Sequence, residues 1–197
     1  MSSTALKSWR EERREHLDDL LDAHKLVGGP APGRRWRTTA INDALILRLA
    51  AEFQGFARDL HDQTSDIFAS WLAPSSPTAQ RVVRNRLVEG RELERGNAHP
   101  GSIGRDFGRF GFEVWRELHN RDERTTNHNE SLALLNDARN GLAHSDEAKL
   151  AALRDKGHPP VLSTFRKWRR DLDILAANLD AEMSDQLARL FDRRRPW

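Results

Sequence analysis

The stretch RNGLAH, residues 139–144, holds the side chains of this chain that are best suited to chemistry. Arginine presents a planar fork of N–H donors that fits phosphate oxygens, and histidine exchanges protons near neutral pH. Arg139, Asn140 and His144 stand among leucines and alanines at the expected end of a helix. The residues alone leave two interpretations open. Either the three polar groups converge on a ligand, or Arg139 covers a helix surface while His144 interacts favourably with the helix dipole.

A helical wheel makes Arg139 the unusual member of this group. At 100° per residue, its side chain falls at the edge of an apolar stripe. The stripe consists of Leu135, Ala138 and Leu142, and a polar ridge beside it consists of Asn136, Asn140 and His144. A guanidinium in this position is costly unless something pairs with it. If Arg139 binds no ligand, its expected partner is a carboxylate of a neighbouring helix, such as Glu52 or Asp59.

The residues that fill the motif say more than its spacing does. With 27 arginines and 8 histidines, chance alone gives roughly one Arg-x4-His pair in a chain of this length. Here, however, an asparagine follows the arginine directly, and small or apolar residues precede the histidine. The stretch resembles the Arg-x4–6-His motif of the HEPN superfamily, whose members often read Arg-Asn-x-x-Ala-His. The segment LAAEFQGFARDL, residues 49–60, is also similar to the first core helix of several HEPN groups.

The resemblance covers roughly residues 38–190 and implies an all-α, HEPN-like helical bundle with a late motif helix and a long closing helix. Active HEPN proteins are metal-independent endoribonucleases, frequently toxins or antiviral effectors, and are commonly homodimers. The resemblance implies that Arg139 and His144 are the catalytic pair and that Asn140 is the polar residue beside them. Cleaving RNA through its own 2′-hydroxyl requires proton transfer and stabilisation of a phosphorane, which suits these residue types. No metal or cofactor is expected.

Two other hypotheses belong to different classes. The first is a non-catalytic HEPN-like module that binds RNA, a nucleotide or a protein partner. The second is a helical interaction protein in which RNGLAH is only a packed helix end. RNA cleavage in EDTA by the protein and by its Arg139 and His144 variants separates the three.

One geometric difficulty bears on the catalytic pair. On an unbroken helix, Arg139 and His144 point about 140° apart and lie about 7.5 Å apart along the axis. Gly141 offers one solution by loosening the last turn, and a homodimer that brings two copies of this helix together offers another. The absence of tyrosine adds a constraint, because some HEPN toxins are neutralised by modification of a tyrosine after the motif histidine. Any antitoxin protein must act here in another way.

The elements that position the motif are expected to be helices, because apolar residues recur at three-and-four spacing and no segment alternates like a strand. The expected helices span 4–27, 38–71, a segment from 78, 103–118 (interrupted by Gly108 and Gly111), 129–143, a short segment after 145, and 164–190. We divide the chain into an N-terminal helix with its Gly/Pro loop, 1–33, and a HEPN-like helical domain, 34–197. The first helix either packs on the bundle or serves a partner.

The composition excludes several classes of site and function. The formal net charge is +2, so no polyanionic partner follows from the total, and Cys 0 excludes disulfides and thiolate metal sites. No apolar run reaches membrane-spanning length, and a cytoplasmic protein is expected. The other central histidines lack metal-ligand spacing and are expected in loops or on the surface: His61, His99, His119, His128 and His158. The basic runs 34–37, 166–170 and 193–195, with Trp36 and Trp168, suit RNA or are plain surface. The tail DRRRPW is expected to fray.

Overall fold

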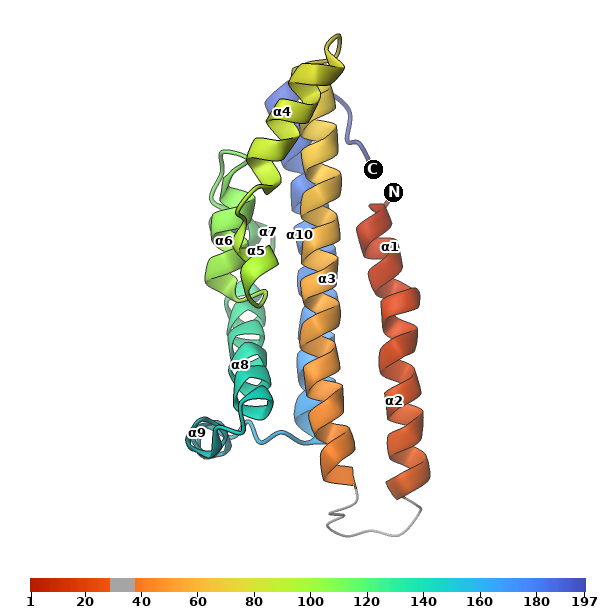
Figure 1. Ribbon diagram of the computed structural model, residues 1–197, viewed down its shortest axis with the longest axis vertical. Helices are drawn as coiled ribbons and strands as arrows, with labels where there is room; N and C mark the ends of the chain where they lie inside the picture. The colour runs from red at the N-terminus through yellow and green to blue at the C-terminus, as the bar shows by residue number, and fades with distance from the viewer. Residues whose placement is uncertain (29–37) are drawn as a thin grey trace.

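A computed structural model describes residues 1–28 and 38–197, and these form ten helices with no strand among them (Figure 1). The predicted all-α helical bundle is therefore confirmed. The Gly/Pro loop beyond Gly28, the basic run 34–37 and Trp36 lie outside the described residues. No helix within the described ranges is long and apolar enough to cross a membrane.

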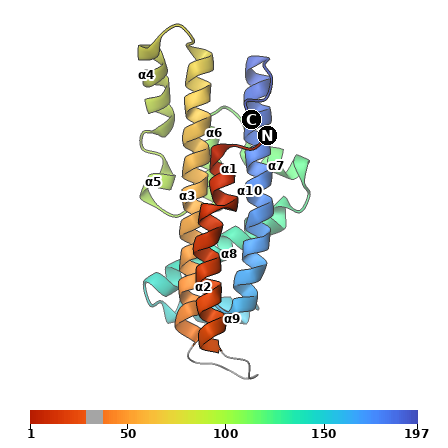
Figure 2. The ribbon, with the colours of Figure 1, turned by 90° about the vertical axis from the view of Figure 1, so that its right-hand side faces the viewer.

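The N-terminal segment forms two helices, α1 (Thr4–Arg10) and α2 (Glu12–Gly28), instead of the single helix expected over 4–27. Ser3 caps α1 by accepting a hydrogen bond from the N–H of Leu6 (2.9 Å). The break falls at Glu11, whose φ of −110° and ψ of −91° are not helical, although its N–H still donates to the carbonyl of Lys7. The two helices continue in nearly the same direction alongside the central helices (Figures 1 and 2).

Two long helices form the centre of the bundle, α3 (Thr39–Leu72) and α10 (Leu162–Phe191), and both match expected segments. Helices α1 and α2 cover one side of them (Figure 2). Trp9 of α1 is 3% exposed and packs edge-on against Phe53 of α3, with ring centroids 5.6 Å apart. Because the N-terminal helices share one apolar core with the rest of the bundle, they pack on it rather than standing apart for a partner.

The other side carries short helices and the motif helix: α4 (Pro77–Val88), α5 (Glu92–Arg95), α6 (Pro100–Gly108), α7 (Val114–Arg121), α8 (Thr125–Ala143) and α9 (Glu147–Asp155). The segment expected as one interrupted helix over 103–118 is two helices, because the chain turns at Gly111, whose φ is +92°. Val82 and Leu190 are large apolar residues whose side chains are exposed rather than packed in the core.

The C-terminal tail is ordered against the bundle, so the expectation that it frays is wrong. Trp197 is 8% exposed, and its Nε1 donates to the Oδ2 of Asp180 (3.1 Å). The hydroxyl of Ser184 donates to the carbonyl of Trp197 (3.0 Å). The backbone N–H of Ser3 also donates to Asp180 (3.3 Å), so this carboxylate holds both ends of the described chain to α10.

Candidate functional site

The motif lies at the junction of α8 and α9, where a helix-ending turn leads into α9, which lies across the direction of α8 (Figure 1). Helix α8 stays helical through Ala143, and His144 is its C-cap. Ser145 then adopts a left-handed φ of 52°, and the N–H of Asp146 donates to the carbonyl of Gly141 (2.8 Å). This is the Schellman arrangement, which satisfies the last carbonyls of a helix.

Gly141 serves this junction by its lack of a side chain. A Cβ at this position would lie 2.8 Å from Cδ2 of Leu150, so α9 packs directly onto the backbone of α8. The helix is not loosened at Gly141, and that expected solution to the angle between Arg139 and His144 is wrong. The glycine admits a neighbouring helix instead.

Arg139 is half-buried, and its Nη1 donates to Oδ1 of Asn140 (3.1 Å). No carboxylate pairs with it within the described ranges. The other described arginines either form an ion pair with a carboxylate or are exposed. Arg139 is thus the one described arginine that is partly withdrawn from solvent without an anionic partner, and most of its N–H donors remain available.

The carboxylates proposed to anchor Arg139 belong to another arginine. Nη1 of Arg13 on α2 donates to Glu52 (2.8 Å), and its Nη2 donates to Asp59 (2.7 Å). The guanidinium can lie across α3 because the intervening residue is Gly55, where a Cβ would stand 2.2 Å from Nη1. The predicted pairing of Arg139 with Glu52 or Asp59 is therefore wrong. These two carboxylates bind Arg13 and so attach the N-terminal helices to α3.

The polar ridge of α8 holds the loop between α5 and α6. Nδ2 of Asn97 donates to Oδ1 of Asn140 (2.7 Å), the same oxygen that accepts from Arg139. One turn earlier, Nδ2 of the buried Asn136 donates to the carbonyl of Ala98 (3.1 Å). Asn140 therefore links the loop to the guanidinium, and it orients Arg139 rather than the histidine.

His144 stands apart from this cluster. Its side chain is exposed, and among the described residues it makes no side-chain hydrogen bond. The structure thus brings together Arg139, Asn140 and Asn97, but it does not bring His144 against them within one chain. Both motif side chains are accessible to solvent, so the motif is not a helix end sealed in the core.

A buried histidine cluster was not anticipated from the sequence. His61 of α3 is 0% exposed, where a loop or surface position was expected, and its ring packs against Phe107 and Phe110. Arg91 donates to its Nδ1 (3.1 Å), so its Nε2–H donates to the carbonyl of Asp106 (3.1 Å). Burial, assisted by the charge of Arg91, lowers the pKa of His61 to about 4. This histidine is a neutral core residue that reaches no solvent.

The remaining histidines also divide by burial. His99 and His119 are exposed as expected, whereas His128 is 4% exposed, and its surface assignment is wrong. His158 is half-buried and stacks on Trp168, whose own side chain is fully buried and unavailable to RNA. The described part of the chain contains no group of three or more His, Asp or Glu side chains placed to hold a metal ion.

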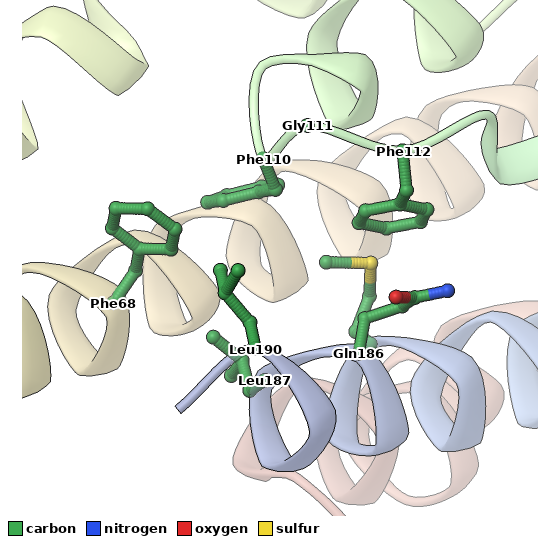
Figure 3. A pocket seen from close by; sticks show the side chains of 8 residues that line it. Phe68, Phe110, Gly111, Phe112, Gln186, Leu187 and Leu190 are labelled. Atoms are coloured by element: carbon green, nitrogen blue, oxygen red, sulfur yellow. The ribbon is translucent and has the colours of Figure 1, made fainter. Parts of the chain in front are cut away.

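An apolar pocket lies far from the motif, near the C-terminal end of α10 (Figure 3). Figure 3 shows the rings of Phe110 and Phe112 facing the side chains of Gln186, Leu187 and Leu190. Its volume is about 60 Å³, well below the roughly 150 Å³ of an engineered cavity that binds benzene. A nucleotide does not fit in this pocket.

Comparisons with known proteins add nothing to this geometry, since no protein-family model, no curated protein and no solved structure matches the chain.

Proposed function

We propose that this chain is a metal-independent endoribonuclease of the HEPN type that cleaves RNA by attack of the RNA's own 2′-hydroxyl. The observation that carries the proposal is Arg139, a half-buried guanidinium without a carboxylate partner among the described residues. Withdrawing a guanidinium from water is costly, and a neighbouring anion normally compensates for it. A phosphate is an anion that the planar donors of arginine bind in two-point contact.

The chemistry assigns a role to each motif residue. Arg139 donates to the phosphate oxygens that gain charge in the phosphorane, while Asn140 holds the guanidinium in place. His144 takes the proton of the attacking 2′-hydroxyl, and a second proton must reach the departing 5′-oxygen. Through the phosphorane, the protonated His144 can supply this second proton, so one Arg139 and one His144 complete the reaction.

A homodimer is part of the proposal, because it can bring Arg139 and His144 of different chains together. Within one chain, α8 is unbroken between Arg139 and Ala143, so the side chains of Arg139 and His144 diverge. Two α8–α9 junctions meeting about a twofold axis place the arginine of one copy near the histidine of the other. For the biological role we propose a toxin or phage-defence effector. Its antitoxin, if it has one, does not modify tyrosine, because the chain contains none.

The test is cleavage of single-stranded RNA by purified protein in excess EDTA. We expect Arg139→Ala and His144→Ala to lower the rate by about 100-fold or more. Arg81→Ala and His119→Ala are matched controls, because both residues are exposed and form no ion pair with another described residue, and they are expected to cleave like the original chain. Cleavage that is unchanged in the two motif variants overturns the proposed site.

Mixing the two inactive variants tests the dimer. If the working pair comes from different chains, a mixed dimer of Arg139→Ala and His144→Ala holds one intact pair and recovers part of the activity. A pair within one chain gives no recovery. Within one chain Arg139 and His144 do not meet, and this also favours a second candidate, a non-catalytic RNA-binding module. That candidate gains support if no RNA is cleaved while Arg139→Ala weakens RNA binding.

A further inference from the structure

An open groove lies between α6, α7 and the first half of α8, at the opposite end of α8 from the motif. Its volume is about 560 Å³, several times that of the apolar pocket near the end of α10. The backbone of α6 forms one wall at Gly101, Gly104 and Gly108, and the side chains of Arg105, Trp115 and Asn129 also line the groove. The space therefore combines an aromatic ring, a guanidinium and a carboxamide.

Trp115 is held in a fixed position at the edge of this space. Its Nε1 donates to the carbonyl of Pro100 (2.9 Å), and its side chain remains partly exposed. A Cβ on Gly104 would lie 3.0 Å from Nε1, so the glycine determines how closely the indole approaches α6. An immobilised, partly exposed aromatic ring beside an open groove suits stacking with a nucleobase, which does not depend on base identity.

The polar groups around the ring suit the rest of a nucleotide. Arg105 is exposed, and its ion pair is with Glu92, another solvent-accessible side chain. Both Nε and Nη2 of Arg105 donate to Glu92, and a phosphate offers the same two-point contact, so the exposed guanidinium can exchange one anionic partner for another. Asn129 supplies both a donor and an acceptor for a base edge. The remaining charge, Glu113, can only accept hydrogen bonds, which favours bases that present amino groups.

The groove is connected to the motif through the backbone and through α8. Pro100 holds the Trp115 indole, and it follows the same short loop whose Asn97 contacts Asn140. On α8, Asn129 lies about 16 Å along the helix axis from Asn140 and on nearly the same face, given 100° and 1.5 Å per residue. An extended oligonucleotide of a few nucleotides spans that length.

We propose that this groove is a base-stacking subsite for single-stranded RNA, in which Trp115 stacks with a base a few nucleotides from the phosphate at Arg139. The proposal rests on the proposed function, because it extends the path of the same substrate. Trp115 binds the base, Arg105 binds the neighbouring phosphate, and Gly104 is a positioning residue that acts through Trp115.

The test measures binding of a short, fluorescently labelled, fully 2′-O-methyl oligonucleotide, which has no free 2′-hydroxyl and stays intact. We expect Trp115→Leu to raise its Kd about tenfold or more. Gly104→Ala is expected to raise the Kd as well, since its methyl displaces the indole. Trp71→Leu is the matched control, because Trp71 is also a partly buried tryptophan but packs against Phe191 outside the groove, and its Kd is expected to stay unchanged.

The outcomes separate this proposal from the ribonuclease proposal. An unchanged Kd in both Trp115→Leu and Gly104→Ala, or no binding by the original chain, overturns the groove. If RNA cleavage still depends on Arg139 in that case, the ribonuclease proposal is retained without the base-stacking groove. Conversely, if binding depends on Trp115 but the chain cleaves no RNA, the groove is supported and the ribonuclease proposal is contradicted. Because Gly104→Ala leaves the indole itself in the chain, it decides the question even if Trp115→Leu fails to fold.

Discussion

The side-chain amide of Asn97 donates to Oδ1 of Asn140 across 2.7 Å, and the same oxygen accepts from Arg139 at 3.1 Å. The guanidinium of the proposed site is therefore held, through one shared acceptor, by a loop more than 40 residues earlier in the chain. Arg139 has no carboxylate partner among the described residues that could orient it instead. Its position depends on a hydrogen bond to an uncharged carboxamide, and this dependence can be tested.

Asn97→Ala removes the donor that fixes Asn140 and should lower RNA cleavage about tenfold, because small displacements of a catalytic group are costly. The free energy of unfolding should fall by only about 1 kcal/mol, the usual contribution of one hydrogen bond. Cleavage kinetics and denaturant unfolding measure the two effects. Asn178→Ala, which removes a single amide hydrogen bond to Asp122 elsewhere, is the control and should leave cleavage intact. Equal activity in both variants contradicts the proposed linkage.

Gly141→Ala should destabilise the protein by about 1–3 kcal/mol, because its methyl overlaps Cδ2 of Leu150 and forces α8 and α9 apart. Urea unfolding monitored by circular dichroism measures the change. The double variant Gly141→Ala with Leu150→Ala should lose less than the sum of the two single variants, since the smaller side chain relieves the clash. Additive losses would show that the two residues do not press on each other.

Arg13→Ala should destabilise the protein by about 1–3 kcal/mol. The substitution leaves Glu52, whose side chain is 6% exposed, with one fewer cationic donor. The neighbouring variant Arg14→Ala is the control, because its pair with Asp18 is long (3.8 Å) and both side chains are about half exposed. Thermal unfolding should therefore show a clear decrease in Tm for Arg13→Ala and almost none for Arg14→Ala. A similar Tm for both would contradict the role of Arg13 in attaching α2 to α3.

Acid should weaken the fold through His61. Its pKa is about 4 in the folded chain against an ordinary 6.5, so between these pH values the unfolded chain binds a proton that the folded chain does not. The contribution of His61 to stability is therefore constant above about pH 6.5 and decreases as the pH falls to about 4. The total loss is about 3 kcal/mol.

His61→Gln tests this assignment, since glutamine offers a donor and an acceptor but does not titrate. The difference in unfolding free energy between the original chain and this variant should change with pH only in that window. His119→Gln, at an exposed histidine, should behave like the original chain. A pH-independent difference for His61→Gln would contradict the depressed pKa.

Trp197→Ala should lower the free energy of unfolding by about 3 kcal/mol, because it removes a buried indole and its hydrogen bonds to Asp180. Differential scanning calorimetry provides the measurement. Arg194→Ala, three residues earlier and exposed, should have little effect. A tail that can lose Trp197 without a change in Tm is not packed as the structure shows.

The sequence by itself determined the all-α class and the two long helices α3 and α10 with their approximate ends. Apolar residues at three-and-four spacing set α3 and α10, and local signals such as the cap at Asp146 set the start of α9. These features depend on neighbours along the chain, so a single sequence contains them. It also placed Arg139 beside apolar residues, which the half-buried side chain confirms.

Only the tertiary structure decided which distant groups meet. Glu52 pairs with Arg13 rather than Arg139 because Gly55 opens a path across α3, and no local pattern connects residues 13, 52 and 55. His61 is buried because Arg91 reaches its Nδ1, and an isolated histidine on a helix gives no sign of this. Charge pairing and burial of polar groups depend on the approach of separate helices, whereas helix formation depends on the chain within each one. For this reason the motif residues could be found in the sequence. The sequence could not show that Asn97 and Asn140 hold Arg139, or that Glu52 and Asp59 do not.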